Sequence, residues 1–538
     1  MSSEKQVEHF DADQTQTGWK LPSAVLMQWT GKISGEYRFA FLSAFVIGLL
    51  IHMPVMLSDI PNHDGLGSMY FDQNMITSGR WFLTIACGFS TYFTIPWVIG
   101  LLGIFFLALT NVVLTDLLEL KDRPGILLMG GLLVSFPALA STFAYVFTLD
   151  GYMLALLLAV LSVWCVSRLR GGKGVCLGAI CLAFSMGTYQ SYLPFAILLC
   201  IYEILRLSMK QQPERTGWET MKASFRYLFM GVMGAALYYG ILQLLLKLEG
   251  KTLDTYQGIS GLGQSGGIGI GNLLRMVRDF FSFSLKGNVL FNNVFSAAAC
   301  VCLLAAAAWV LVLRAKERKW WKNPWFFVII IGVVIILPLG TNVILLVSPN
   351  VTYHLLMRYQ WVVLLICLFH FVISYKAGQK SGVAALWAGY LAAFVLVFNY
   401  ALSDNIGYSN LEKRYEKTYA YCVRLLDRIE QTEGYYQGIP IAMVGVVGYN
   451  PFPETDITLP VTSNMIGLSG DTLLYTGENY QVFMKNYLGA TLNIMSPEET
   501  KDIYFSEEYI AMESFPAASS VKIVDGIMYV KTENVGRD

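Results

Sequence analysis

Residues 325–347 read WFFVIIIGVVIILPLGTNVILLV and contain no charged side chain. An α-helix needs about 20 consecutive apolar residues to cross the hydrocarbon core of a bilayer. This stretch is long enough, and similar runs recur along most of the chain. The sequence therefore predicts an α-helical polytopic membrane protein with about eleven transmembrane helices. We place them near residues 37–58, 96–119, 126–147, 151–169, 174–189, 191–209, 226–248, 290–314, 325–347, 359–375 and 383–403.

The composition indicates the same class of protein. Of the 538 residues, 55% are hydrophobic and only 14% are charged, whereas about a quarter of the residues in soluble domains are charged. The formal net charge is zero, so no basic field favours a nucleic-acid partner. The nine cysteines and five histidines show no metal-ligand spacing. A soluble enzyme, a nucleic-acid-binding protein, a zinc site and a disulfide-stapled secreted domain are therefore disfavoured.

The connections between the apolar runs alternate in charge. One set, together with the N-terminal arm 1–36, carries about twenty basic residues, and the other set carries about seven. Basic connections remain on the cytoplasmic side of a membrane. This asymmetry predicts a cytoplasmic N-terminus, and an odd number of spans then places the C-terminus outside.

The chain becomes polar after about residue 403, and the remaining stretch is long enough for a small domain. Residues 410–434 have the periodicity of an amphipathic helix, 439–447 is a short apolar run typical of a strand, and 521–530 has the pattern of a hairpin. This stretch contains no recognisable catalytic motif, and we expect it to cover or shape the outer face. The predicted parts are a cytoplasmic arm (1–36), a membrane domain (37–403) with long outward loops (59–95 and 249–289), and an extracytoplasmic α+β domain (404–538).

The first long outward loop is rich in ionisable side chains. A charge near bilayer depth costs roughly 2.5–3.5 kcal/mol, so such groups beside apolar helices are more often functional or paired than accidental. Each carboxylate also has a structural interpretation. Asp59 and Asp72 can cap helices, and Asp64 fits a solvated Asn-His-Asp-Gly turn. The residues concerned are Asp59, His63, Asp64, Asp72 and Arg80, the last of which is followed by Trp81.

A long first outward loop with an acidic residue soon after the first span resembles the class C (GT-C) glycosyltransferases. The step Gly79-Arg80-Trp81 before the next hydrophobic segment is similar to the serotype-converting O-antigen glucosyltransferase family of bacteria. Tyr189-Gln190 at the outer end of a span and the helix after the last span also resemble that family. The likeness covers most of the membrane region. It implies an enzyme of the bacterial inner membrane that transfers a sugar, glucose in this family, from a polyprenyl-phosphate-sugar donor to a cell-surface glycan such as O-antigen.

The resemblance also implies a general base in the first outward loop, inversion at the anomeric carbon, and no metal or other cofactor. Asp64 is the best match for the base and Asp59 the second, so both stay candidates. A sugar hydroxyl is a poor nucleophile, and a carboxylate within hydrogen-bond reach can take its proton as the new bond forms.

The leaving group of such a reaction is a lipid phosphate. Positive charge must meet it as its negative charge grows, and the guanidinium fork of arginine suits phosphate oxygens. The alternative role for an outward arginine is that of an interfacial anchor. The arginines expected to bind the donor phosphate are Arg358, Arg80, Arg275 and Arg278.

Other residues of the outward connections are expected to contact substrate. Asp150 lies in a tight connection between two spans, where capping of the next helix is the alternative. Tyr189 and Gln190 offer a ring and hydrogen bonds to a sugar, although interfacial tyrosines are common. The glycine-rich stretch 258–271 lacks the pattern of a nucleotide loop, and we interpret it as a gate or a plain linker. The substrate-binding set is Asp72, His63, Trp81, Asp150, Tyr189, Gln190 and His354.

Two other classes of function stay open. A transporter or flippase of a lipid-linked or small solute would show repeat symmetry and ionisable groups at mid-membrane. Here the ionisable groups gather in outward loops and no matching halves are apparent, which favours an enzyme. A non-catalytic assembly protein, with the C-terminal domain as its working part, is disfavoured by the charged first loop.

Overall fold

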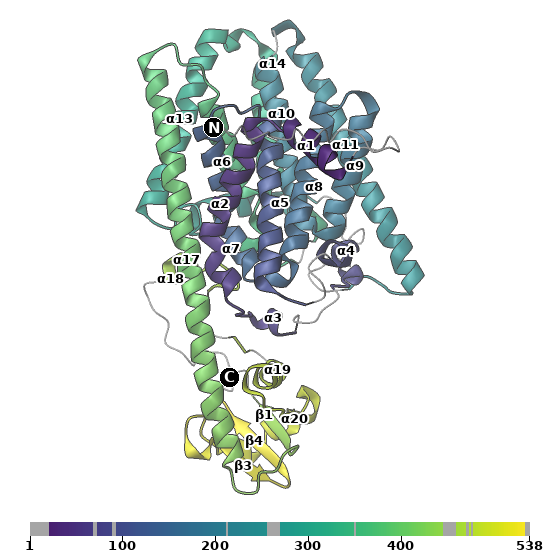
Figure 1. Cartoon of the computed structure of the whole chain (residues 1–538), viewed down its shortest axis with the longest axis vertical. Coiled ribbons are helices and arrows are strands. Elements are labelled where there is room, and N and C mark those ends of the chain that lie inside the picture. The colour runs from purple at the N-terminus through teal and green to yellow at the C-terminus, as the bar shows by residue number, and fades with distance from the viewer. Residues whose placement is uncertain are drawn as a thin grey trace, which may run out of the picture.

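The computed structural model describes residues 21–67, 73–88, 93–210, 213–254, 269–348, 351–444, 459–469, 473–474 and 477–532. Asp72 and most of the glycine-rich stretch 258–271 lie outside these ranges, as does the side chain of His63. The described part is a bundle of long helices with a small sheet beyond one end (Figure 1).

Ten helices of the described residues are long and apolar enough to cross a membrane, or up to eleven if one bent pair forms a single span. This is the multi-pass architecture that the apolar runs predict. The ten candidates correspond to α2 (Gly35–Leu57), α5 (Pro96–Leu117), α8 (Leu149–Arg168), α9 (Gly171–Thr188), α10 (Leu193–Lys210), α11 (Pro213–Glu249), α13 (Val294–Arg318), α14 (Pro324–Thr341), α16 (Trp361–Ile373) and α17 (Lys380–Glu430). The candidates that correspond to α8, α10 and α16 begin a few residues earlier, at Val146, Gln190 and Leu355. The bent pair is α6 (Arg123–Ser135) and α7 (Pro137–Phe143), which meet at 49°.

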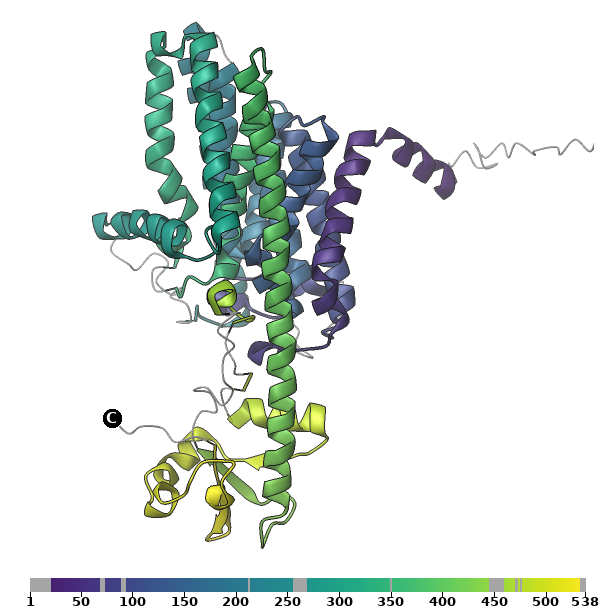
Figure 2. The same cartoon turned by 90° about the vertical axis from the view of Figure 1, so that its left-hand side faces the viewer.

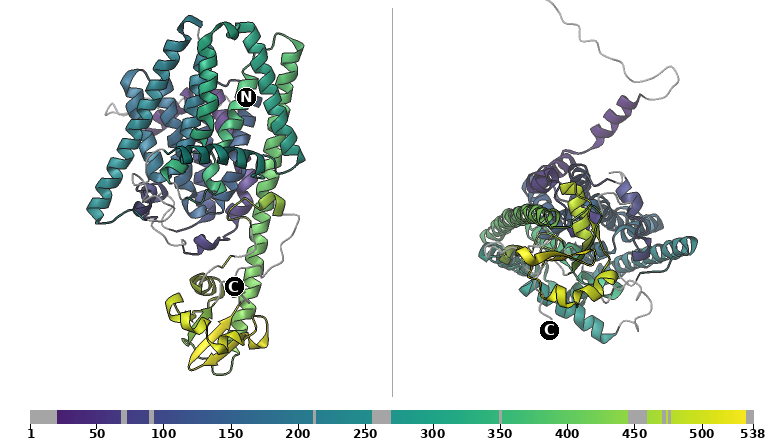
Figure 3. Two further views of the ribbon diagram at one scale, coloured as in Figure 1. Left: turned by 180° about the vertical axis from the view of Figure 1, so that it is seen from behind. Right: turned by 90° about the horizontal axis from the view of Figure 1, so that it is seen from below.

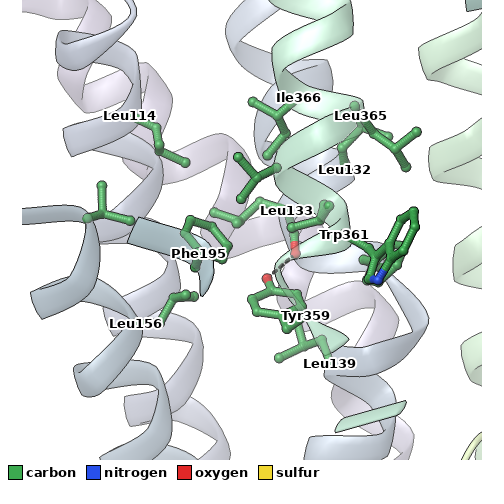
Figure 4. Packing of buried hydrophobic residues seen from close by; sticks show 14 of the residues in the cluster. Leu114, Leu132, Leu133, Leu139, Leu156, Phe195, Tyr359, Trp361, Leu365 and Ile366 are labelled. Carbon is green, nitrogen blue, oxygen red and sulfur yellow. Dashed lines mark hydrogen bonds between the residues drawn. The ribbon is translucent and has the colours of Figure 1, made fainter. Parts of the chain in front are cut away.

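The bend between α6 and α7 has a clear chemical cause. Pro137 has no N–H, so it cannot bond to the carbonyl of Leu133 four residues earlier. The Tyr359 hydroxyl donates to that carbonyl, as Figure 4 shows, and His52 Nε2 donates to the carbonyl of Val134 at 2.8 Å. Side chains of neighbouring helices thus satisfy the carbonyls that the break releases, as the interior of a bilayer requires.

Helix α12 (Ile270–Lys286) lies across the other helices near one end of the bundle, as the teal helix in Figure 2 shows. One face is buried through Met276 and Phe283. The exposed part has an apolar stripe and, beside it, a basic stripe. This three-way division is typical of a helix that packs on protein and lies in a membrane interface. The apolar stripe is Ile270, Leu274, Phe281 and Leu285, and the basic stripe is Arg275, Arg278 and Lys286.

Short elements gather at this same end of the bundle. They are α3 (His63–Gly67), η1 (Ile76–Ser78), α4 (Leu83–Cys87), η3 (Val146–Thr148), η4 (Gln190–Tyr192), α15 (Ile344–Val347) and η7 (Leu355–Arg358). The N-terminal helix α1 (Pro22–Lys32) lies near the opposite end (Figure 1).

The boundary expected at residue 403 falls inside a helix. The sequence predicts a new amphipathic helix from residue 410, whereas α17 continues for 51 residues without a break. At 1.5 Å per residue it is about 76 Å long, more than twice the thickness of a hydrocarbon core. No proline interrupts it, so the polar residues after 403 extend the helix out of the bundle.

The C-terminal region is the small α+β unit that the sequence predicts. Its sheet has the strand order β2-β1-β4-β3. The predicted hairpin is confirmed, because Val521 pairs with Val530 and Val524 with Ile527 in antiparallel register. The elements are β1 (Pro440–Val444), α18 (Leu459–Thr462), α19 (Gly477–Leu488), β2 (Asn493–Ile494), α20 (Pro497–Tyr504), α21 (Glu507–Ile510), η8 (Ala518–Ser520), β3 (Val521–Val524) and β4 (Ile527–Lys531).

Helix α3, which belongs to the first long loop, is held between the bundle and this C-terminal domain. Leu66 of α3 is buried in the hydrophobic core of the domain, together with Leu425 of α17 and Phe483 of α19. The view from below in Figure 3 shows the domain projecting over the end of the bundle. The position of α3 therefore depends on both parts of the molecule.

Candidate active site

A cavity of about 480 Å³ is lined in part by α3. Helix α3 lies at the end of the bundle that faces the C-terminal domain (Figure 1). The wall of this cavity comes from α3, from residues 73–83 and 142–148, from the start of α8, from η4, and from residues 344–348 and 351–357. Five of the residues that the sequence singles out line this main cavity: Asp64, Arg80, Tyr189, Gln190 and His354.

Arg80 is held against a pair of stacked rings in the main cavity. The rings of Tyr152 and Tyr189 lie 4.0 Å apart between centroids, at 8° to each other. Arg80 Nη1 donates to the Tyr152 hydroxyl at 3.0 Å, and the guanidinium carbon lies 5.1 Å from the centroid of the Tyr189 ring. The charge is therefore positioned by both a hydrogen bond and a ring face.

Residues 73–83 have little regular structure of their own and are anchored by their neighbours. Gln190 Nε2 donates to the Ser78 carbonyl at 3.2 Å and to the Tyr238 hydroxyl at 3.0 Å. The backbone N–H of Phe82 donates to the carbonyl of Gly187 at 2.7 Å. Gln190 thus has a structural role in addition to lining the cavity.

Trp81 points away from the main cavity and is buried against α9. Its ring packs edge-on against Phe184, with 5.4 Å between centroids. It also covers Gly187 so closely that a Cβ built there would lie 2.5 Å from the indole. Trp81 therefore acts as the anchor that fixes the neighbouring Arg80.

We expect Gly187→Ala to lower the melting temperature of the purified protein. The added methyl group meets a buried indole, and overpacking of this kind costs about 1–3 kcal/mol. Gly240→Ala on α11 is the matched control, because nothing lies within 4 Å of a Cβ there. Equal melting temperatures of the two variants in detergent would contradict this packing.

The structure separates the two aspartates between which the sequence could not choose. Asp64 lies in the first turn of α3 and lines the main cavity. Asn62 fixes that turn, because its Oδ1 accepts from the N–H of Gly65 at 2.8 Å and its Nδ2 donates to the Ala144 carbonyl at 2.6 Å.

Asp59 lies in a different, smaller hollow beside Tyr487 of α19. Burial raises the pKa of its carboxyl group. Phe147 stands between this hollow and the main cavity, since it lines both. Asp59 therefore faces the C-terminal domain, whereas Asp64 faces the main cavity.

The four arginines expected at the donor phosphate occupy three different places. Arg80 lines the main cavity. Arg358 is buried, and its Nη1 and Nη2 bind the two carboxylate oxygens of Asp279 at 2.7 and 2.9 Å. Arg275 and Arg278 are exposed on the basic stripe of α12.

Two rings complete the surroundings of Arg358. Its guanidinium carbon lies 3.8 Å from the centroid of Tyr353 and 4.6 Å from that of Phe283. Arg358 thus connects α12 to the segment before α16, because Phe283 and its ion-pair partner Asp279 both belong to α12.

His354 and Asp150 complete the expected set. His354 is half-buried, and burial together with the nearby Arg358 lowers the pKa of its imidazole. Asp150 is fully buried in the first turn of α8, where its Oδ1 accepts from the N–H of Gly151 at 2.8 Å. The structure places Asp150 behind the wall of the main cavity, which it does not line.

Most of the other residues that line the main cavity were not predicted from the sequence, among them Tyr152 and Ile466. Tyr152 follows Asp150 closely in the same tight connection, and an aromatic ring beside such a turn was a signal that the sequence offered. Ile466 comes from the C-terminal region and also lines the cavity. A single isoleucine carries no signal of this kind in the sequence.

Comparison with known families agrees with the sequence-based resemblance. The family model described as glucosyl transferase GtrII matches residues 53–369, more than half of the chain. The match includes every described residue that lines the main cavity except Ile466. Comparison with curated proteins and with solved structures gives no significant match. The expected membership in the serotype-converting glucosyltransferase family is confirmed, and the chain belongs to the glucosyl transferase GtrII family.

Proposed function

We propose that this protein is an integral-membrane glucosyltransferase of the GT-C type in the bacterial inner membrane. It transfers glucose from polyprenyl-phosphate-glucose to a cell-surface glycan such as O-antigen, and it uses no metal. The observation that carries this proposal is one cavity lined by a carboxylate, Asp64, and a positioned guanidinium, Arg80. These are the two groups that a displacement at a sugar phosphate requires.

The proposed reaction is a single displacement that inverts the anomeric carbon. The acceptor hydroxyl oxygen forms a bond to that carbon on the face opposite the phosphate. The hydroxyl proton passes to the Asp64 carboxylate as this bond forms. The bond between the carbon and the phosphate oxygen breaks, and the lipid phosphate leaves with the electron pair. Arg80 stabilises the charge that grows on this phosphate.

The polar groups beside Arg80 suit the sugar of the donor. Hydroxyl and amide groups bind the polar edge of a hexose, while the exposed edges of aromatic rings contact its C–H groups. Tyr189 and Gln190 line the cavity beside Arg80. We assign the glucosyl group to this part of the main cavity.

The charges of the connections support an outer location for the main cavity. Helices α8 and α10 begin beside the cavity and end at Arg168 and Lys210, so these basic residues lie at the opposite end of the bundle. Basic connections face the cytoplasm. The main cavity and the C-terminal domain are then extracytoplasmic.

Helix α12 is suited to guide the lipid-linked donor. Its apolar stripe matches the acyl region and its basic stripe the level of the lipid phosphates. We propose that Arg275 and Arg278 attract the donor at the membrane surface. In the same proposal, Arg358 holds α12 in place through Asp279.

The direct test is transfer of labelled glucose from polyprenyl-phosphate-glucose to O-polysaccharide by the purified protein in detergent. We expect label in the polysaccharide and release of polyprenyl phosphate. A transporter or flippase would leave the sugar–phosphate bond intact. Absence of transfer, combined with movement of intact donor across proteoliposome membranes, would overturn the proposal.

A further inference from the structure

A second cavity, of about 380 Å³, adjoins the main cavity. His354 and Ile466 line both cavities and form the boundary between them. The side nearer the bundle comes from α12 and from residues 353–358. The other side comes from the C-terminal region, through Ser463, Asn464 and Ser469.

The C-terminal side of the second cavity is fixed in place by hydrogen bonds. Arg414 Nη2 donates to the Gly467 carbonyl at 2.8 Å, and Asn410 Nδ2 donates to the Leu468 carbonyl at 2.7 Å. Both donors belong to α17. Asn464 Nδ2 reaches the Gly287 carbonyl beyond α12 at 2.5 Å. The wall is thus preformed, and the amide oxygen of Asn464 offers an acceptor for a ligand hydroxyl.

A close approach of Gly467 to the side chains of Ala144 and Tyr145 joins this wall to the main cavity. Gly467 has a φ of +84°, which favours glycine. A Cβ at Gly467 would lie 2.8 Å from Ala144 and 2.9 Å from the ring of Tyr145. Tyr145 lines the main cavity. The segment around Ile466 is therefore seated on the rim of the main cavity.

The second cavity suits an uncharged ligand. Its arginine, Arg358, already binds both oxygens of Asp279, so the pair carries no net charge. A phosphate at Arg358 would have to compete with that carboxylate. The remaining polar side chains carry hydroxyl and amide groups and the imidazole of His354, and the ring of Tyr353 adds an apolar surface. This combination of polar groups and one ring is suited to a neutral saccharide.

We propose that the second cavity is the acceptor subsite and that it holds an uncharged sugar unit of the acceptor glycan. This inference rests on the proposed function and assigns the acceptor to residues of the C-terminal region. The hydroxyl that reacts would enter the main cavity between His354 and Ile466. A transfer reaction requires such adjacency, because the two reacting atoms must come within about 3–3.5 Å of each other.

Blocking the second cavity tests this assignment. Ser463 is exposed at its rim, so Ser463→Tyr fills the space with little effect on the fold. We expect the KM for O-polysaccharide to rise by about tenfold or more, while the KM for polyprenyl-phosphate-glucose stays within about twofold. Asn464→Ala should also raise the KM for O-polysaccharide. Ser519→Tyr, an exposed position elsewhere in the C-terminal domain, is the matched control.

Direct binding separates this inference from the proposed function. O-polysaccharide released from its lipid by mild acid is titrated into the purified protein in detergent without donor. We expect saturable binding by the wild type and by Ser519→Tyr, and a loss of affinity in Ser463→Tyr. Equal affinity of all three proteins would overturn the subsite, whether or not transfer occurs. A rise in the donor KM alone would overturn it too, since it would place the donor in the second cavity. Saturable binding without transfer would contradict only the proposed reaction.

Discussion

Asp64→Asn is expected to reduce the turnover number by about 10²–10⁴-fold, because the amide keeps the shape of the side chain but cannot accept the proton of the acceptor hydroxyl. The carboxylate lines the main cavity from the first turn of α3. Asn62 holds this turn through its own hydrogen bonds to Gly65 and Ala144, so the substitution leaves the turn intact. The measurement is kcat at saturating donor and acceptor, with the amount of folded protein determined by size-exclusion chromatography.

Asp59→Asn is the informative comparison, since it makes the same change five residues earlier. Asp59 lies in the hollow beside Tyr487, on the other side of Phe147, and we expect a far smaller effect on kcat. A larger loss of kcat in Asp59→Asn than in Asp64→Asn would identify Asp59 as the base. Full activity of both single variants and of the double variant would show that neither aspartate is the base.

Arg80→Gln is expected to lower kcat by about 10²–10³-fold, the range found when one group that stabilises developing charge is removed. Arg80→Lys tests whether the planar guanidinium group is needed or whether a positive charge is enough. Lysine keeps the charge but lacks the planar fork that binds two phosphate oxygens while donating to Tyr152. We expect Arg80→Lys to recover only part of the lost rate.

The control for Arg80 is Arg424→Gln, at an exposed position of α17 outside both cavities. Its kcat should equal that of the wild type. An unchanged kcat in Arg80→Gln would show that the leaving phosphate is stabilised elsewhere. Arg358→Gln would then be the next variant to measure, although loss of its ion pair with Asp279 also loosens α12.

Local patterns in the sequence were sufficient for the architecture. Hydropathy identified the apolar helices, because each must present an apolar surface to lipid along its own length. The Asp525-Gly526 turn identified the C-terminal hairpin, because turn chemistry acts between adjacent residues. The predicted start of the outer helix at residue 410 was wrong because that prediction also used only local patterns. The polar residues near 403–410 look like a connection, but a helix whose backbone bonds are satisfied internally can continue from lipid into water.

The candidate site was only partly predictable. Asp64, Arg80 and His354 could be selected one by one, because ionisable residues beside apolar helices are more often functional or paired than accidental. Tyr189 and Gln190 could be selected through the resemblance to the glucosyltransferase family. Their assembly into one cavity was not visible, since the segments that carry them are separated by up to about 290 residues of chain.

The sequence by itself determined that this chain is a multi-pass membrane protein with an acidic first long loop and a small C-terminal α+β domain. Only the tertiary structure decided that Asp64 and not Asp59 faces the main cavity, that Arg358 is neutralised by Asp279, and that the C-terminal region supplies part of the cavity wall. The physical reason is the distance along the chain over which each kind of interaction acts. Hydropathy and turn chemistry act over a few residues, whereas a site forms where side chains distant in sequence pack against one another, as Leu66 does in the core of the C-terminal domain.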